Sequence, residues 1–217
     1  MIGINLNCNL ILKERIKMEY PQFYKEVKTI TMFDPLSEVL GSFEKGIITF
    51  NYVDVVKAAG HSCPTVGGAY LMTYKALEAL YGDEIPVRGN IKIEFKENEV
   101  EGVAGVIGNV ISNITGATRI TGFKGLGGKF ARHSLMDFDS KITSSARFTR
   151  TDTRSYVDVF YNPSSVAGHP NTQPLMQKMM SDMASVEEKL EFGRLWQERV
   201  KAILVDNCDN EKVIRVM

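Results

Sequence analysis

The sequence predicts an α+β fold: a mainly antiparallel sheet packed with helices on one face, plus a C-terminal helical pair. In two segments, 91–96 and 154–161, residue character alternates along the chain, which is typical of strands with one solvent-exposed face. Two longer segments, 64–82 and 186–205, carry apolar residues at helical spacing. Because helices and strands interleave while the strand pairs look antiparallel, we expect the helices to cover one face of the sheet.

A chain of 217 residues is long enough for one substantial core. We therefore treat 1–217 as a single domain, with a lead-in over 1–33 and a C-terminal helical extension over 172–217. The extension either packs on the same core or is exchanged with a partner subunit.

The N-terminal part of the chain is expected to contain short helices and a strand. Residues 13–19 form either a short helix or an ordered lead-in, and spacing predicts a short amphipathic helix over 21–27. Asp34 before Pro35 is typical of a helix N-terminus, and the glycines that follow mark its end. The β-branched and aromatic segment 47–52 predicts a strand.

The central helix follows a short helix or turn over 54–59. Proline is well tolerated at the first helical position, so Cys63 should lie at the N-terminus of a helix that ends near Gly82. A turn at 83–86 precedes the strand at 91–96. Residues 103–115 suit a buried strand by composition, but their length and spacing favour a helix.

The last third of the chain is expected to begin with a strand over 130–138. A loop over 163–174 follows the strand at 154–161, and the helices span about 172–183 and 186–205. Ser185 and Glu188 have the spacing of a capping box for the second helix. Within these helices, Trp196 and the methionines are interpreted as core or interface residues.

Composition excludes several classes of protein. Lys and Arg number 26 and Asp and Glu also 26, so no positive field favours nucleic acid. No apolar run approaches membrane-spanning length. The first residues lack the pattern of a secretory signal, and an odd number of cysteines, 3, argues against a disulfide framework. We expect a cytoplasmic protein that binds neither nucleic acid nor membrane.

His61 and Cys63 carry the most plausible chemistry. The free N–H groups and the dipole of a helix N-terminus favour a thiolate at Cys63. A thiolate and an imidazole two residues apart suit one soft cation, zinc or another late first-row transition metal. The alternative is a small buried cysteine with an unrelated histidine beside it.

The segment Gly60-His61-Ser62-Cys63-Pro64 also resembles the Gly-His-x-Cys-Pro signature of the FmdE family, which takes its name from formylmethanofuran dehydrogenase. A second segment is similar to that family's Thr-Gly-Cys-Thr turn and glycine-rich run: Thr115 to Thr118, followed by glycines up to Gly128 and Lys129. The resemblance covers the middle third to half of the chain. It implies a metal-binding homodimer that is accessory to a molybdenum or tungsten enzyme of anaerobic one-carbon metabolism, its partner metalloenzyme.

The chain departs from the family pattern at several positions. Ala59 replaces a histidine, Thr65 a glycine, and Ala117 the cysteine of Thr-Gly-Cys-Thr. In the helix before that turn, where the family pattern runs from an acidic residue to an amide, this chain has Asn109 and Ser112. Only His61 and Cys63 are therefore carried over as metal ligands.

Two ligands do not complete a site, because such ions need about four donors, or three plus water. His133 and His169 could supply others, within the chain or across a dimer; each could equally be an ordinary surface histidine. Cys8 and Cys208 lie near the two ends of the sequence and are less suited.

The glycine-rich run raises a phosphate-binding alternative. A phosphate loop would need a glycine at Phe123 and a hydroxyl residue at Phe130, so the spacing fails. Tight turns explain these glycines better, although Lys129 with Gly127 and Gly128 keeps a weak anion or cofactor role.

Three hypotheses follow for the function. The first is a metal-binding FmdE-like protein; the sequence does not decide whether it is an enzyme, in which water or a substrate would take an open position. The second is a carrier of haem or another tetrapyrrole, with His61 or Cys63 as axial ligand. The third is an interaction protein whose site has decayed. A Cys63 nucleophile with His61 as base ranks below metal binding, since neighbours two apart rarely bring nitrogen to sulfur.

Overall fold

The computed structural model describes residues 18–217. The expectation for 13–19, apart from Met18 and Glu19, and the position of Cys8 lie outside the described residues. The helices and turns are η1 (Gln22–Lys25), α2 (Pro35–Leu40), η2 (Glu44–Gly46), α3 (Tyr52–Ala59), α4 (Pro64–Tyr81), α5 (Ala104–Thr115), η3 (Pro163–Ser165), α6 (Thr172–Met180), α7 (Val186–Lys201) and η4 (Ala202–Asp206). The strands are β1 (Ile30–Phe33), β2 (Ile47–Phe50), β3 (Ile91–Phe95), β4 (Met136–Asp137), β5 (Ala146–Arg150), β6 (Tyr156–Tyr161) and β7 (Ile214–Val216).

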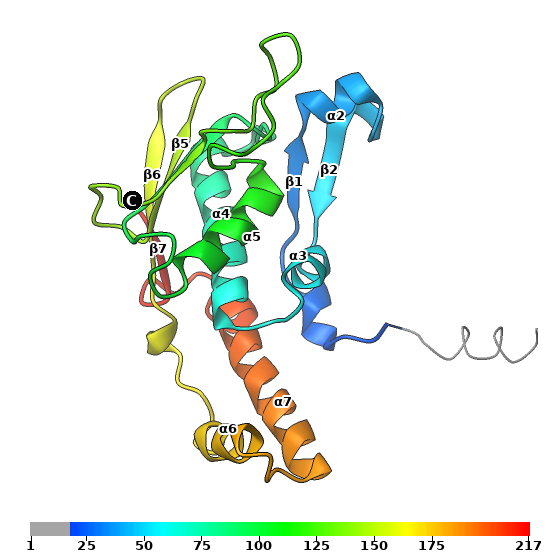
Figure 1. The fold of residues 1–217 in the computed structure, drawn as a ribbon, viewed down its shortest axis with the longest axis vertical. Coiled ribbons are helices and arrows are strands. Elements are labelled where there is room, and N and C mark those ends of the chain that lie inside the picture. The colour runs from blue at the N-terminus through cyan, green and yellow to red at the C-terminus, as the bar shows by residue number, and fades with distance from the viewer. Residues whose placement is uncertain (1–17) are drawn as a thin grey trace, which may run out of the picture.

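The fold is α+β, as predicted. Five strands form one sheet in the order β4-β3-β5-β6-β7, in which only the short β3–β4 pair is parallel. Helices α4 and α5 lie between this sheet and the antiparallel hairpin β1–β2 (Figure 1). Alternation in β3 buries Ile91, Ile93 and Phe95 and leaves Lys92 and Glu94 half-buried, so this strand has one apolar and one charged face.

Helix α4 is the centre of the core. Its N-terminal half is buried on all sides from Val66 to Thr73, and the helix contacts α3, α5, β6, β7 and η4. The Thr73 hydroxyl donates to the Ala69 carbonyl at 2.7 Å, which satisfies a polar group inside the apolar interior. The predicted helix from Pro64 to the glycine at 82 is confirmed, as is the helix at 104–115.

The C-terminal hairpin stands away from this core. Helices α6 and α7 project from the rest of the molecule at the end opposite the tip of the β1–β2 hairpin (Figure 1). Helix α6 has no buried residue, and α7 buries only Leu195 and Val200. The predicted capping box of Ser185 and Glu188 is confirmed. Within residues 18–217, no helix combines the length and the hydropathy that a bilayer crossing needs.

The predicted strand at 130–138 is wrong except for Met136–Asp137. Phe130 and Ser134 have φ values of 63° and 57°, which an extended strand cannot contain. The backbone amide of Arg132 donates to the Phe123 carbonyl, and that of Leu135 to the Thr118 carbonyl. The segment therefore folds back on 118–123 as an irregular loop.

Three strands have no counterpart in the predicted elements: β1, β5 and β7. Segment 21–27 forms the short 3₁₀ turn η1 rather than an amphipathic helix, and the strand expected over 47–52 ends at Phe50 because α3 begins at Tyr52. The strand expected from 154 begins at Tyr156. The second C-terminal helix changes after Lys201 into the wider π turn η4.

Candidate functional site

The candidate site is the four-residue connection between α3 and α4. Gly60 ends α3 in the left-handed region with φ 76°, a conformation that favours glycine. Cys63 is extended and is the N-cap of α4, and Pro64 is the first helical residue. These local signals, a C-cap glycine and an N-terminal proline, place His61 and Cys63 where the sequence predicts them.

The two side chains face each other. The Cys63 Sγ lies 3.4 Å from the His61 Nε2 and accepts a hydrogen bond from the Val66 N–H at 3.4 Å. The His61 Nδ1 lies 3.0 Å from the Ala59 carbonyl oxygen. Because a carbonyl can only accept, Nδ1 carries the proton, so the lone pair of neutral His61 is on Nε2 and is directed at the sulfur. The expectation that neighbours two apart would not bring nitrogen to sulfur is wrong here.

Ser62 holds this loop in place. Its carbonyl accepts hydrogen bonds from the Trp196 Nε1 and the Gln197 Nε2, each at 3.1 Å, both from α7. Its hydroxyl lies 2.9 Å from the Tyr52 hydroxyl of α3. Ser62 is buried, whereas His61 is exposed and Cys63 half-buried. The backbone between the two functional side chains is therefore fixed while the side chains stay accessible.

Two tyrosines, the buried Tyr52 and the half-buried Tyr161, flank the start of α4. The Tyr161 hydroxyl donates to the Pro64 carbonyl at 2.7 Å, and its ring packs against Gly68. Burial raises the pKa of Tyr161 and of Tyr52 well above the usual value, so both hydroxyls are neutral hydrogen-bonding groups at ordinary pH. Neither phenol brings a charge to the loop.

The spacing of the two donors fits a shared ion. A nitrogen at about 2.0 Å and a sulfur at about 2.3 Å from one tetrahedral ion lie about 3.5 Å apart. The observed separation of 3.4 Å agrees with that value. The hydrogen bond from Nδ1 to a backbone carbonyl is the arrangement that usually orients a metal-bound histidine.

No third ligand joins them within the described part of the chain. Among residues 18–217 no group of three or more His, Cys, Asp and Glu side chains could hold one ion. His133 bonds to the Ser134 hydroxyl, and His169 accepts the Asn171 N–H ahead of α6. The structure thus brings together His61 and Cys63 and leaves the other two histidines elsewhere.

The glycine-rich run forms an exposed turn. The Leu126 and Lys129 amides donate to each other's carbonyl oxygens at 2.9 Å, which closes a tight turn around Gly127 and Gly128. Both glycines have positive φ, 55° and 76°, and nothing lies within 4 Å of either where a side chain would be. The interpretation as a tight turn fits this geometry, and the weak anion or cofactor role of Lys129 with the two glycines stays a prediction.

Sequence reasoning missed the groups that anchor the loop. Trp196 packs against the core, as expected, and in addition its indole N–H bonds to the backbone of the site. Gln197 and Tyr52 carry no motif that would have singled them out. No protein-family model matches this chain, and no curated protein matches it.

Proposed function

We propose that the His61–Cys63 loop binds zinc or another late first-row transition-metal ion. The observation that carries this proposal is the 3.4 Å approach of Nε2 and Sγ, with the nitrogen lone pair directed at the sulfur. Imidazole and thiolate are donors that such ions prefer, whereas Mg²⁺ and Ca²⁺ prefer oxygen donors. When bound, an ion of this class supplies a Lewis acid with coordination positions left for other ligands.

The role of the chain's own residues follows from the contacts. Ser62, held by Trp196, Gln197 and Tyr52, keeps the loop backbone rigid. The Ala59 carbonyl keeps the proton of His61 on Nδ1, which leaves Nε2 free to bind. The Val66 N–H donates to the Cys63 sulfur at 3.4 Å and so holds the sulfur at the N-terminus of α4.

Metal analysis of untagged protein purified without oxygen tests the proposal. Loss of a direct ligand should lower metal affinity by more than the roughly 10–100-fold typical of groups that only orient a ligand. We expect metal in the wild type and strong loss in His61→Ala and Cys63→Ser. Cys208→Ser, which removes a thiol outside the loop, is the matched control and should keep the metal.

The outcomes separate the alternatives. Equal metal content in all four proteins overturns metal binding at this loop. A Soret absorption band that is lost in the same two variants would instead favour a tetrapyrrole carrier. Protein with neither metal nor chromophore would favour an interaction protein with a decayed site.

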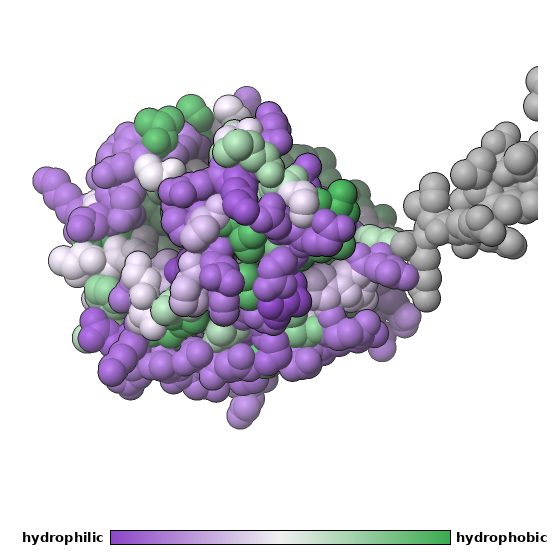
Figure 2. Space-filling model, turned by 90° about the horizontal axis from the view of Figure 1, so that it is seen from below, coloured by the Kyte–Doolittle hydropathy of each residue, from purple (hydrophilic) through white to green (hydrophobic). Residues whose placement is uncertain are grey.

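We further propose that the chain is a homodimer formed through the α6–α7 hairpin. Large apolar side chains on the hairpin are 69–76% exposed: Met180, Met183, Val186 and Leu190. Figure 2 looks onto this end of the molecule and shows separate hydrophobic patches between hydrophilic side chains. Charges of both signs alternate there, with Lys178, Lys189 and Arg194 near Glu187 and Glu191, so a second copy is an electrostatically suitable partner.

A dimer would also answer the shortage of ligands. Two copies together hold two imidazoles and two thiolates in their loops, the four donors of a Cys₂His₂ set. The metal content tells the arrangements apart: one ion per two chains for a shared site, one ion per chain where outside ligands complete each loop. Variants of His133 and His169 to Ala test whether a partner's histidine contributes instead.

Sedimentation equilibrium of the Met183→Lys/Leu190→Lys variant tests the interface. We expect a dimer for the wild type and a monomer for this variant, because two charges would have to be buried. Val39→Lys, at a side chain 62% exposed on α2, is the matched control and should stay dimeric. A monomeric wild type overturns the proposal.

The wider role rests on the resemblance to FmdE proteins. We propose an accessory protein of a molybdenum or tungsten enzyme, located in the cytoplasm. Cys63 and Cys208 are both free thiols, as a reducing compartment would keep them. Co-purification of a molybdenum- or tungsten-containing protein with the tagged chain, lost in the Cys63→Ser variant, is the corresponding measurement.

A further inference from the structure

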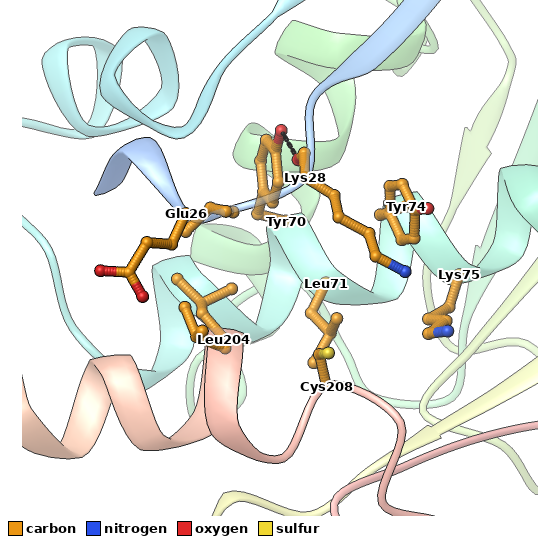
Figure 3. A pocket seen from close by; sticks show the side chains of 10 residues that line it. Glu26, Lys28, Tyr70, Leu71, Tyr74, Lys75, Leu204 and Cys208 are labelled. Carbon is orange, nitrogen blue, oxygen red and sulfur yellow. Dashed lines mark hydrogen bonds between the residues drawn. The ribbon is translucent and has the colours of Figure 1, made fainter. Parts of the chain in front are cut away.

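A cavity of about 220 Å³ lies between α4, the segment before β1 and η4 with the residues that follow it (Figure 3). Its lining combines apolar side chains with Glu26, Lys28, Lys75 and the Cys208 thiol. It shares no lining residue with the His61–Cys63 loop. Whatever it binds is therefore recognised independently of the proposed metal.

The inner wall is apolar and rigid. Val27, Leu71 and Leu204 are buried, and Leu204 comes from the widened π turn η4, a feature often found at functional sites. The Tyr70 hydroxyl donates to the Lys28 carbonyl at 2.7 Å and lies 3.1 Å from the Phe50 carbonyl oxygen, which ties the segment before β1 to α4. The space is thus held open by groups that are themselves fixed.

Two lysine ammonium groups lie at the rim of the cavity. The Lys28 and Lys75 Nζ atoms lie 5.3 Å and 5.8 Å from the centre of the Tyr74 ring, so two ammonium groups converge on one edge of the cavity. Lys75 is paired with Glu78 and Asp209. Among the described residues no carboxylate lies within salt-bridge distance of Lys28, and the Glu26 carboxylate points away from the cavity (Figure 3).

The thiol adds no competing charge. Cys208 lies beside Leu71 at the base of the cavity (Figure 3). Burial, together with Asp209, raises the pKa of Cys208, so the thiol is neutral at pH 7. A ligand in this cavity would meet an apolar wall at one end and an ammonium group without a carboxylate partner at the other.

We propose that this cavity binds a small organic acid, with its hydrocarbon part against Leu71 and Leu204 and its carboxylate at Lys28. The volume is below the range of about 300–1,000 Å³ that holds drug-sized ligands, which limits the occupant to a smaller molecule. The lysine stem lines the apolar wall while its ammonium group stays at the mouth, the usual behaviour of a partly buried lysine.

Hexanoate is the probe, measured by NMR titration and by the rate of alkylation of Cys208 in the full chain. Hexanoate should slow alkylation of Cys208 and leave that of Cys63 unchanged, with each site followed by peptide mass spectrometry. Lys28→Met keeps the apolar stem and should weaken hexanoate binding about tenfold, with hexanol binding unchanged. Lys124→Met, at an exposed lysine outside the cavity, is the matched control and should bind hexanoate like the wild type.

Several results would overturn the proposal. Equal binding of hexanoate and hexanol would show that the charge is not recognised. Undiminished binding in the Lys28→Met variant, or unchanged alkylation of Cys208, would place the acid elsewhere. Affinity that keeps rising from hexanoate to decanoate would indicate a nonspecific apolar surface rather than a cavity of limited size.

Discussion

Replacing Gly68 with alanine tests how α4 is fixed to the sheet. An added Cβ would overlap the ring of Tyr161, whose hydroxyl bonds to the Pro64 carbonyl at 2.7 Å. In an exposed helix the same substitution stabilises by about 1 kcal/mol because glycine is a poor helix former. At Gly68 this gain is opposed by overpacking, about 1–3 kcal/mol, and by loss of a hydrogen bond worth about 1 kcal/mol.

The sum is a net destabilisation of about 1–3 kcal/mol for Gly68→Ala. Gly193 supplies the contrast, since it lies inside α7 with nothing within 4 Å of the added Cβ. Gly193→Ala should raise the free energy of unfolding by up to about 1 kcal/mol. Urea denaturation followed by circular dichroism measures both changes.

The cause is checked by a double substitution. In a Tyr161→Ala background the added methyl meets no ring, so Gly68→Ala should no longer destabilise and should approach its helix-propensity gain. Stabilisation by Gly68→Ala in the wild-type background would refute the packing of Tyr161 against α4. Because Cys63 precedes Pro64, displacement of that ring should also lower metal content.

Asp34→Asn should cost about 3–5 kcal/mol at pH 7, because it leaves Arg132 without its buried partner at 2.6 Å while the amide can still cap α2. Burial raises the pKa of Asp34, but hydrogen bonds from Ser37 and Arg88 and the charge of Arg132 outweigh it and leave the pKa lowered. This stabilisation is present above the unfolded pKa of about 3.9 and is lost as the pH falls through the folded pKa, so urea titrations of variant and wild type should converge in acid. Tyr52→Phe removes the bond to the Ser62 hydroxyl, and we expect a loss of about 1 kcal/mol in urea denaturation together with weaker metal retention.

Local signals made α4 and the candidate loop predictable. A proline after Cys63, a glycine at 82 and apolar residues between them act within one helix, so no distant contact is needed to recognise it. The same signals place His61 and Cys63 in one short connection, but they do not predict the 3.4 Å approach of nitrogen to sulfur.

Features that depend on distant pairing were not predictable. Strand β7 is formed by three residues that pair with β6 more than 50 residues earlier in the sequence. The Trp196 indole reaches a carbonyl 134 residues away. The prediction of a strand over 130–138 is wrong because only local composition was used. The composition suits a strand, but the backbone forms hydrogen bonds with residues 118–123 instead.

The attachment of Ser62 to both α3 and α7 has a consequence for any cation that the loop accepts. Small zinc modules collapse when they are stripped with a chelator, because the ion is their main cross-link. Here the protein supplies the cross-links itself, so a chelator should empty the loop and leave the chain folded, with the melting temperature lowered only by the lost binding free energy. Such a loop is suited to an ion that binds reversibly rather than to a structural ion.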